Sequence, residues 1–242
     1  MGGLLLVVAV LTFLLMPKSK PAEDSGGKQS PGGIIAILKV PGVALASFSI
    51  ITGSITIGFL NSTLEPHIRQ FNLNPVLTGL VFIINGGLYA VTAPAWGWLC
   101  DRVVQPVYAG LAGAVVVLIG FILIGPAPFL PMDTVLWLTC VGLMIHGIGL
   151  GATLVSAFVM ALRESINHGF ADNIQTYGLT SALWTSLFAL GSFIGPSVGG
   201  ILLDEVGFRW ATVFVLGVQV VLMILILGYL AKSRQGRANF GK

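Results

Sequence analysis

Charged residues are scarce in this sequence: they make up 9% of its 242 residues, whereas a soluble domain carries about 25%. So few charges cannot cover a globular surface with solvated groups, and hydrophobic residues make up 55% of the chain. The surface must therefore face lipid, which excludes a soluble enzyme, a nucleic-acid-binding protein and a disordered chain. The sequence predicts an integral membrane protein whose first partner is the lipid bilayer.

Residues for catalysis and metal binding are also few. The two cysteines, Cys100 and Cys140, offer no disulfide framework. The sequence has no phosphate-binding loop, no Gly-x-Ser-x-Gly motif and no His/Cys/Asp/Glu cluster at metal-ligand spacing. Gly147, Gly149 and Gly151 lack the strand and the acidic partner that a dinucleotide site needs. We therefore expect that the protein is not an enzyme and that it binds no cofactor and no metal ion.

Long apolar runs are abundant instead, and a helix needs about 20 such residues to cross a bilayer. Charged and turn residues separate the runs, and short alternating segments are absent, which favours helices. The sequence predicts an all-α polytopic membrane protein with six transmembrane helices, at residues 40–64, 76–99, 107–124, 134–162, 177–203 and 210–231.

The chain opens with a shorter apolar run, residues 1–16. Its first charged residue, Lys18, follows the run, whereas a signal peptide has its basic region before the apolar core. We expect the end of a truncated transmembrane helix here, with a signal peptide as the alternative. Residues 17–39 are polar and rich in proline, glycine and serine, which predicts a flexible, exposed linker.

The basic residues are distributed unevenly between the two sides of the membrane. If the linker is cytoplasmic, all twelve lysines and arginines except Arg69 and Arg209 fall on the cytoplasmic side. Cytoplasmic loops are generally enriched in these residues. The pattern predicts a cytoplasmic linker at 17–39, a membrane domain at 40–231 and a cytoplasmic tail at 232–242.

The pattern Gly-x-Leu-x-Asp-Arg occupies residues 97–102, between the second and third predicted helices. It combines a tight turn at Gly97 with Asp101 and Arg102, and an Asp–Arg pair there would hold helices together at the cytoplasmic face. The pattern resembles a cytoplasmic loop of the major facilitator superfamily, although no further basic residues follow it. A truncated helix, a linker and six helices also resemble the C-terminal half of such a transporter. The resemblance implies a missing N-terminal six-helix half.

A run of small residues marks the fifth predicted helix. It contains Gly191, Gly195, Pro196, Gly199 and Gly200. Small residues let helix backbones approach closely, and a proline bends a helix. The run is similar to the Gly-Pro-x-x-Gly-Gly motif of drug and vesicular amine antiporters. Plain helix packing is the alternative explanation.

Leu-Glu-Pro at residues 64–66 resembles a motif of the vesicular amine transporters, solute carrier family 18. The resemblance implies that Glu65 binds a proton or a cationic amine. It also implies that Tyr89, eight residues before Gly97, lines the substrate cavity, and Tyr177 matches a tyrosine that opens a later helix of the family. On this basis we expect proton-coupled antiport of a small organic cation in a vesicle or another endomembrane.

Three positions depart from the vesicular monoamine members of that family. Those members carry an acid where this chain has Leu154, a second acid at the position of Thr185, and a tyrosine at the position of Phe193. The better resemblance is to the divergent, vesicular polyamine transporter-like member. A polyamine is therefore one candidate for the transported amine.

Glu65 has a second interpretation that does not involve transport. It lies 25 residues after Val40, about 38 Å along a straight helix, which exceeds an apolar core of about 30 Å. It would then be hydrated at the membrane surface and paired with His67 or Arg69. The functional interpretation places Glu65 inside the bilayer instead. A carboxylate there costs roughly 2.5–3.5 kcal/mol and is usually functional.

Four other side chains are candidates for lining the cavity, in addition to Tyr177. Asn85 and His146 lie within predicted helices, where they could line a pocket or relay protons, or simply bond to a neighbouring helix. Trp184 and Phe193 could offer aromatic faces to an ammonium group, or pack against other helices and lipid.

A second hypothesis for the chain is a truncated, non-transporting protein that assembles with or regulates a full-length transporter.

Overall fold

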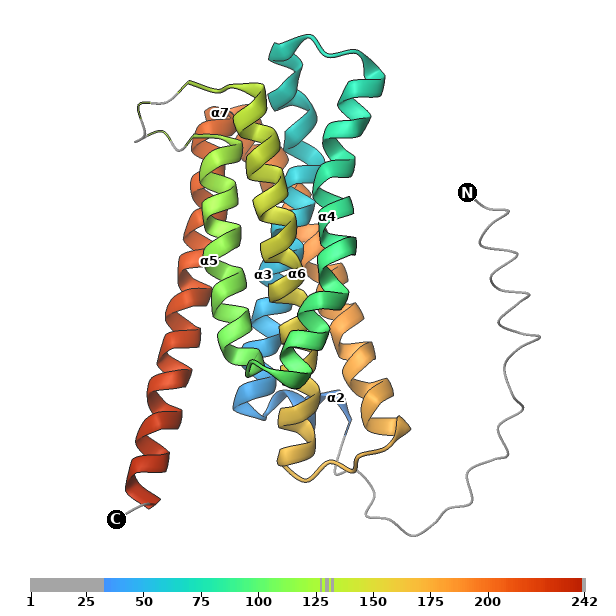
Figure 1. Cartoon of the computed structure of the whole chain (residues 1–242), viewed down its shortest axis with the longest axis vertical. Coiled ribbons are helices and arrows are strands. Elements are labelled where there is room, and N and C mark those ends of the chain that lie inside the picture. The colour runs from blue at the N-terminus through green and yellow to red at the C-terminus, as the bar shows by residue number, and fades with distance from the viewer. Residues whose placement is uncertain (1–32, 127, 129–130, 132, 241–242) are drawn as a thin grey trace, which may run out of the picture.

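The computed structural model describes residues 33–126, 128, 131 and 133–240, and their side chains up to residue 233. The expected helix end at 1–16 and residues 17–32 of the expected linker lie outside this part. The described chain is helical and forms an elongated bundle (Figure 1). Its elements are α2 (Ile34–Leu38), α3 (Pro41–Ile68), the short 3-10 helix η1 (Arg69–Phe71), α4 (Pro75–Arg102), α5 (Pro106–Ile124), α6 (Leu136–Asn167) and α7 (Ile174–Phe240).

Three of the long helices begin at a proline. Pro41, Pro75 and Pro106 are the first residues of α3, α4 and α5. A proline suits this position because its fixed φ is helical and its missing N–H would have no partner in the first turn. Asn74 caps α4 as well, since its side-chain oxygen accepts a hydrogen bond from the backbone nitrogen of Leu77 at 2.8 Å.

Five helices of the described chain are long and apolar enough to cross a membrane, one fewer than expected. The difference lies in α7, which contains both of the last two predicted helices, 177–203 and 210–231. A single non-helical residue, Gly207 with φ 76° and ψ 167°, divides α7 into two arms. Figure 1 shows the arms running down different sides of the bundle from its top. Glycine tolerates a positive φ, so one residue replaces the expected loop.

The first arm of α7 packs closely against α3 through the glycine-rich run. A Cβ atom added to Gly195 would lie 2.5 Å from the carbonyl oxygen of Ile55, and one added to Gly199 would lie 2.9 Å from Cδ2 of Phe59. The close helix approach expected from these small residues is therefore present. Gly200 is different, because a Cβ there would meet nothing within 4 Å.

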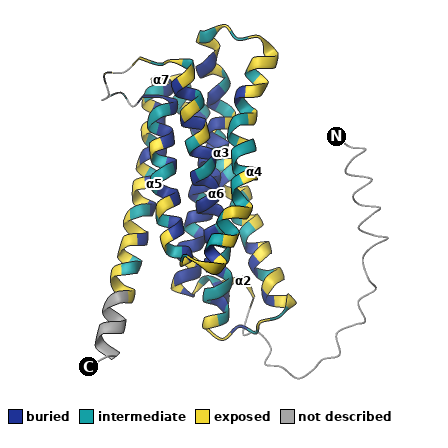
Figure 2. Ribbon diagram, viewed as in Figure 1, coloured by how far each residue is buried: buried dark blue, intermediate teal, exposed yellow. Residues whose placement is uncertain are grey.

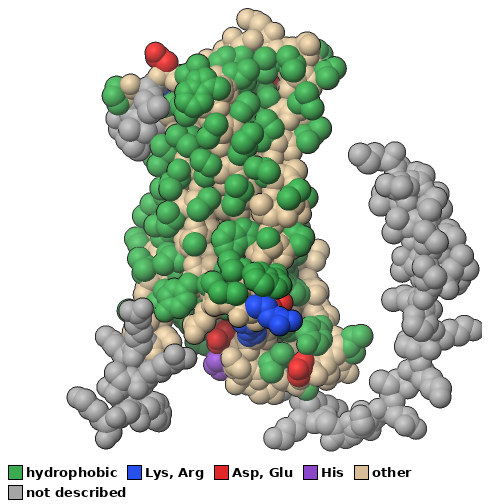
Figure 3. Space-filling view, in the orientation of Figure 1, with side chains coloured by type: hydrophobic (Ala, Val, Ile, Leu, Met, Phe, Trp, Pro, Cys, Tyr) green, Lys and Arg blue, Asp and Glu red, His purple; other side chains and the backbone are tan. Residues whose placement is uncertain are grey.

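Helices α3 and α6 occupy the centre of the bundle, while α4 lies at its edge (Figure 2). Of the 28 residues of α4, only Val81 and Cys100 are buried. The bundle's outer surface is largely hydrophobic in the view of Figure 3, as expected for contact with lipid. At the lower end, Ile37 of α2 is fully buried in the core. Residues 34–38 of the expected linker are thus helical and anchored by Ile37, while Ile34 and Ile35 are exposed.

Candidate functional site

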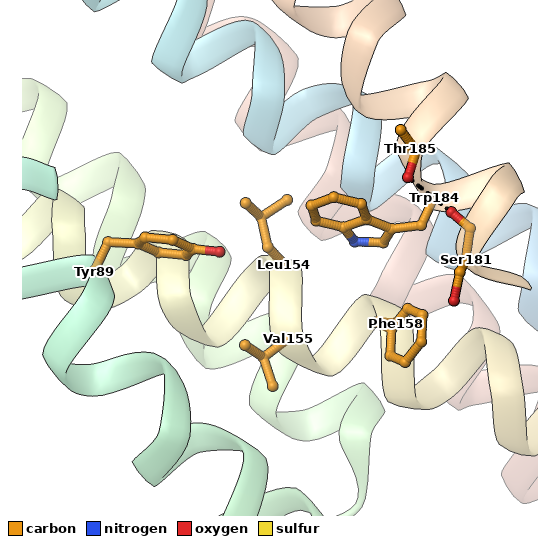
Figure 4. Close-up of a pocket in the computed structure, with 7 residues that line it drawn as sticks. All are labelled: Tyr89, Leu154, Val155, Phe158, Ser181, Trp184 and Thr185. Carbon is orange, nitrogen blue, oxygen red and sulfur yellow. Dashed lines mark hydrogen bonds between the residues drawn. The ribbon is translucent and has the colours of Figure 1, made fainter. Parts of the chain in front are cut away.

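A cavity of about 320 Å³ opens between α4, α6 and the first arm of α7 (Figure 4). Its lining is aromatic, aliphatic and hydroxylic, with no acidic or basic side chain. The residues that line it are Tyr89 from α4, Leu154, Val155 and Phe158 from α6, and Ser181, Trp184 and Thr185 from α7. We call this cavity the aromatic pocket.

Helical spacing explains which residues reach the aromatic pocket. Residues three and four positions apart share one face of a helix, and α7 contributes Ser181, Trp184 and Thr185 in this way. The indole of Trp184 is held by Phe188, whose ring stacks on it at 5.1 Å with an interplanar angle of 13°. Tyr89 extends toward the pocket from the opposite side, with its hydroxyl directed toward the α6 residues (Figure 4).

Two of the candidate residues come together in this pocket. Tyr89 and Trp184 both line it. Leu154 and Thr185, the two uncharged positions noted in the sequence, also line it. This wall therefore carries no charge at either position.

Three lining residues, Val155, Phe158 and Ser181, were not identified from the sequence. Once Leu154 and Thr185 are known to face the pocket, helical spacing adds two of these three. Phe158 is four residues after Leu154, and Ser181 is four residues before Thr185.

Glu65 lies apart from the aromatic pocket, at the end of α3. Its carboxylate accepts two hydrogen bonds from Arg69, Nη2 to Oε2 at 2.8 Å and Nε to Oε1 at 3.3 Å, and its side chain is 47% exposed. Together with Asn72 and Thr78, the pair borders a smaller cavity of about 260 Å³. Of the two partners considered for Glu65, His67 and Arg69, the structure shows the pairing with Arg69. His67 turns inward instead and stacks on Phe208 at 3.7 Å.

Asn85 and His146 bond between helices and do not line the aromatic pocket. His146 is fully buried, with Nδ1 3.1 Å from Oδ1 of Asn85 and Nε2 3.1 Å from Oγ1 of Thr56. Two further candidates also lie elsewhere. The hydroxyl of Tyr177 donates to Asp172 at 2.8 Å, and Phe193 is 71% exposed.

The Asp–Arg pair expected at residues 97–102 takes its arginine from another helix. Asp101 binds Arg163 of α6, with Nη2 of the arginine 3.0 Å from Oδ1. The neighbouring Arg102 is exposed. The motif therefore supplies the carboxylate of an ion pair between α4 and α6. The arginine lies far from the motif in sequence, so the motif alone did not reveal this pair. Among the described residues, no group of three His, Cys, Asp or Glu side chains could hold a metal ion.

Comparison with known proteins places the chain among transporters. The family model of the Major Facilitator Superfamily matches residues 1–171. The chain belongs to this superfamily. It is similar to the MFS-type transporter SLC18B1 of Rattus norvegicus, with 32% identity over 213 residues, and to that of Homo sapiens, with 31% identity over 216 residues. Its five long apolar helices suit a multi-pass membrane protein of this superfamily.

The similarity extends to an amine transporter. The Chromaffin granule amine transporter of Rattus norvegicus is 24% identical over 221 residues, which are 86% of this chain and 37% of the relative. The two SLC18B1 proteins are matched over 87% of this chain but over only 46% and 45% of their own lengths. The chain thus spans about half the length, or less, of these curated relatives.

Proposed function

We propose that this superfamily member forms the C-terminal half of a transporter that exchanges protons for a small organic amine across a vesicle membrane or another endomembrane. The observation that supports this most is the aromatic pocket, where Tyr89 and Trp184 border one cavity. An aromatic face attracts an ammonium group by about 0.5–2 kcal/mol. Its uncharged lining also suits the methylene segments of a polyamine.

In this proposal the membrane domain crosses the bilayer six times. The two arms of α7 on either side of Gly207 each cross once, and α3, α4, α5 and α6 supply the other four crossings. The basic residues then place the linker at 17–39 and the tail at 232–242 in the cytoplasm. The Glu65 end of α3 faces the vesicle lumen.

Glu65 supplies the exchangeable charge in this mechanism. A carboxylate can bind either a proton or a cationic amine, so it can couple the exit of one to the entry of the other. The pairing with Arg69 is compatible with such exchange, because exposed ion pairs contribute only about 0–1 kcal/mol. A competing proton or amine therefore displaces the arginine at little cost.

A six-helix half provides one wall of the transport pathway. The extensive exposure of α4 supports a second wall, which we assign to an N-terminal six-helix half. We expect the purified chain alone to transport nothing, and the complete two-half transporter to take up amines when the proton gradient is imposed. Uptake into liposomes by the chain alone, as a monomer, would contradict this assignment.

The second candidate function is that of a truncated protein that assembles with a full-length transporter and regulates it. Blotting native membranes with an antibody to residues 232–242 distinguishes the two. A band near twice the calculated 25.4 kDa supports the transporter half, and a band near 25.4 kDa supports the regulatory protein.

Proton-driven amine uptake into proteoliposomes tests the transport proposal directly. The complete transporter should accumulate amine only when the lumen is acidic, and replacing Tyr89 by leucine should weaken amine binding. If the complete protein moves no amine under any gradient, the proposed function is wrong.

A further inference from the structure

A polar cluster of Thr56, Asn85 and His146 lies where α3, α4 and α6 meet. The imidazole of His146 is fully buried and touches one polar group on each of the other two helices, both at 3.1 Å. The ring of Phe121 from α5 meets it edge-on at 5.0 Å. None of these three contacts is ionisable, so the cluster offers the ring hydrogen bonds without a counter-charge.

The hydroxyl of Thr56 determines which ring nitrogen of His146 carries a hydrogen. Its oxygen lies 2.7 Å from the carbonyl oxygen of Gly53 and 3.1 Å from Nε2 of His146. Two oxygens at 2.7 Å must share a hydrogen, and the carbonyl can only accept. The one hydroxyl hydrogen is therefore committed to Gly53. Thr56 can then only accept from the ring, so Nε2 of His146 must donate.

Asn85 determines the state of the other ring nitrogen. With Nε2 protonated, a neutral ring leaves Nδ1 as an acceptor, and the Asn85 amide must present its NH2 group to it. If the amide oxygen faced Nδ1, both nitrogens would carry hydrogens and the ring would be a buried cation. Burying a charge that has no counter-charge is costly. Turning the amide by 180° exchanges its oxygen and its NH2 group without changing its shape, so the neutral arrangement fits.

We infer that His146 is a neutral imidazole with its hydrogen on Nε2, and that it is the positioning residue that holds Tyr89 in the aromatic pocket. This role rests on the proposed function, because it concerns the same pocket. Tyr89 follows Asn85 by one helical turn, about 6 Å along α4. Beyond Tyr89, Trp96 donates from Nε1 to the carbonyl oxygen of Ile148 at 3.1 Å. Along α4, Tyr89 thus lies between two hydrogen bonds that join α4 to α6. His146 accepts the hydrogen bond from Asn85.

Nitrogen NMR of the histidine-labelled chain in lipid nanodiscs tests the protonation state directly. The chain has only three histidines, so the His67→Gln and His168→Gln variants assign the spectrum. We expect His146 to be neutral, with its hydrogen on Nε2, throughout the neutral pH range. In Asn85→Asp the new carboxylate cannot donate to Nδ1, so the Nε2-only spectrum should be lost. A wild-type ring that is cationic, or protonated on Nδ1 alone, overturns the inference.

Transport by the complete protein tests the positioning role. His146→Leu removes both hydrogen bonds, and we expect the KM for amine to rise about tenfold while membrane insertion is unchanged. His146→Gln keeps one donor and one acceptor, and should restore most of the wild-type KM without a titratable group. His168→Gln, an exposed histidine on the loop after α6, is the matched control and should behave as wild type.

The response of His146→Gln to a proton gradient separates positioning from proton transfer. If this variant still exchanges amine for amine but no longer responds to the gradient, His146 carries the coupled proton and the positioning role is wrong. If His146→Leu leaves KM unchanged, the positioning role is also wrong. Failure of the wild-type protein to transport any amine would instead overturn the proposed function, and the NMR experiment would still decide the protonation state.

Discussion

Arg163 of α6 binds two groups at the end of α4: its Nη2 atom lies 3.0 Å from Oδ1 of Asp101 and 3.0 Å from the carbonyl oxygen of Cys100. The carbonyl belongs to the last turn of α4, where backbone oxygens have no helical partner. One guanidinium therefore satisfies both a carboxylate and a helix terminus. The two helices are tied together at the end opposite to Glu65.

Replacement of Arg163 by glutamine should lower the stability of the bundle. The exposed ion pair contributes about 0–1 kcal/mol and the bond to the carbonyl about 0.5–1.5 kcal/mol. We expect a loss of about 1–2 kcal/mol, measured as a lower temperature for loss of monodisperse protein in detergent. Arg102→Gln is the control, since Arg102 is the other arginine next to Asp101 and is exposed. An equal loss of stability in both variants would show that positive charge near Asp101, and not the contact made by Arg163, stabilises the bundle.

Gly195 should tolerate no side chain, whereas Gly200 should tolerate one. A Cβ on Gly195 would lie 2.5 Å from the carbonyl oxygen of Ile55, a backbone atom that cannot move without shifting α3. We expect Gly195→Ala to destabilise the protein by about 1–3 kcal/mol, as overpacking does. Gly200→Ala meets nothing within 4 Å and should be neutral. The same thermal measurement compares them, and a neutral Gly195→Ala would contradict the close approach of α7 to α3.

The starts of α3, α4 and α5 could be predicted from the sequence because local chemistry determines them. Pro41, Pro75 and Pro106 combine with long apolar runs, and each helix begins within one residue of its predicted start. The break in α7 was predicted as a loop, because Asp204 and Arg209 interrupt the apolar run. The structure needs only the positive φ of Gly207 there, a property of backbone geometry that hydropathy does not report.

The candidate site depended more on tertiary contacts. Tyr89 and Trp184, two candidates from the sequence, line the aromatic pocket, whereas Phe158 was not a candidate. Which face of α6 borders the cavity depends on how α6 is rotated against its neighbours, and no local pattern gives that rotation. The same holds for Asp101, whose partner Arg163 is 62 residues away in sequence.

Glu65→Gln should abolish proton-driven amine uptake while membrane insertion is retained. Glutamine keeps the size of the side chain but cannot bind a proton or neutralise an amine. Arg69→Gln is the informative companion, since it removes the partner and leaves the carboxylate free. We expect that variant to keep its uptake. The comparison is made by initial uptake rates in proteoliposomes of the complete transporter, and unchanged uptake by Glu65→Gln would exclude its coupling role.

Trp184→Leu should weaken amine binding. The KM for amine should rise by a larger factor than the maximal rate falls. The indole borders the aromatic pocket and is held in place by stacking on Phe188. Its loss removes one cation–π contact of about 0.5–2 kcal/mol, so the KM for amine should rise about two- to thirtyfold. Phe214→Leu is the matched control, because Phe214 lies on the second arm of α7 in a separate groove with Phe48. Equal KM values for Trp184→Leu and Phe214→Leu would mean that the amine does not bind against this wall, and the substrate site would have to lie elsewhere.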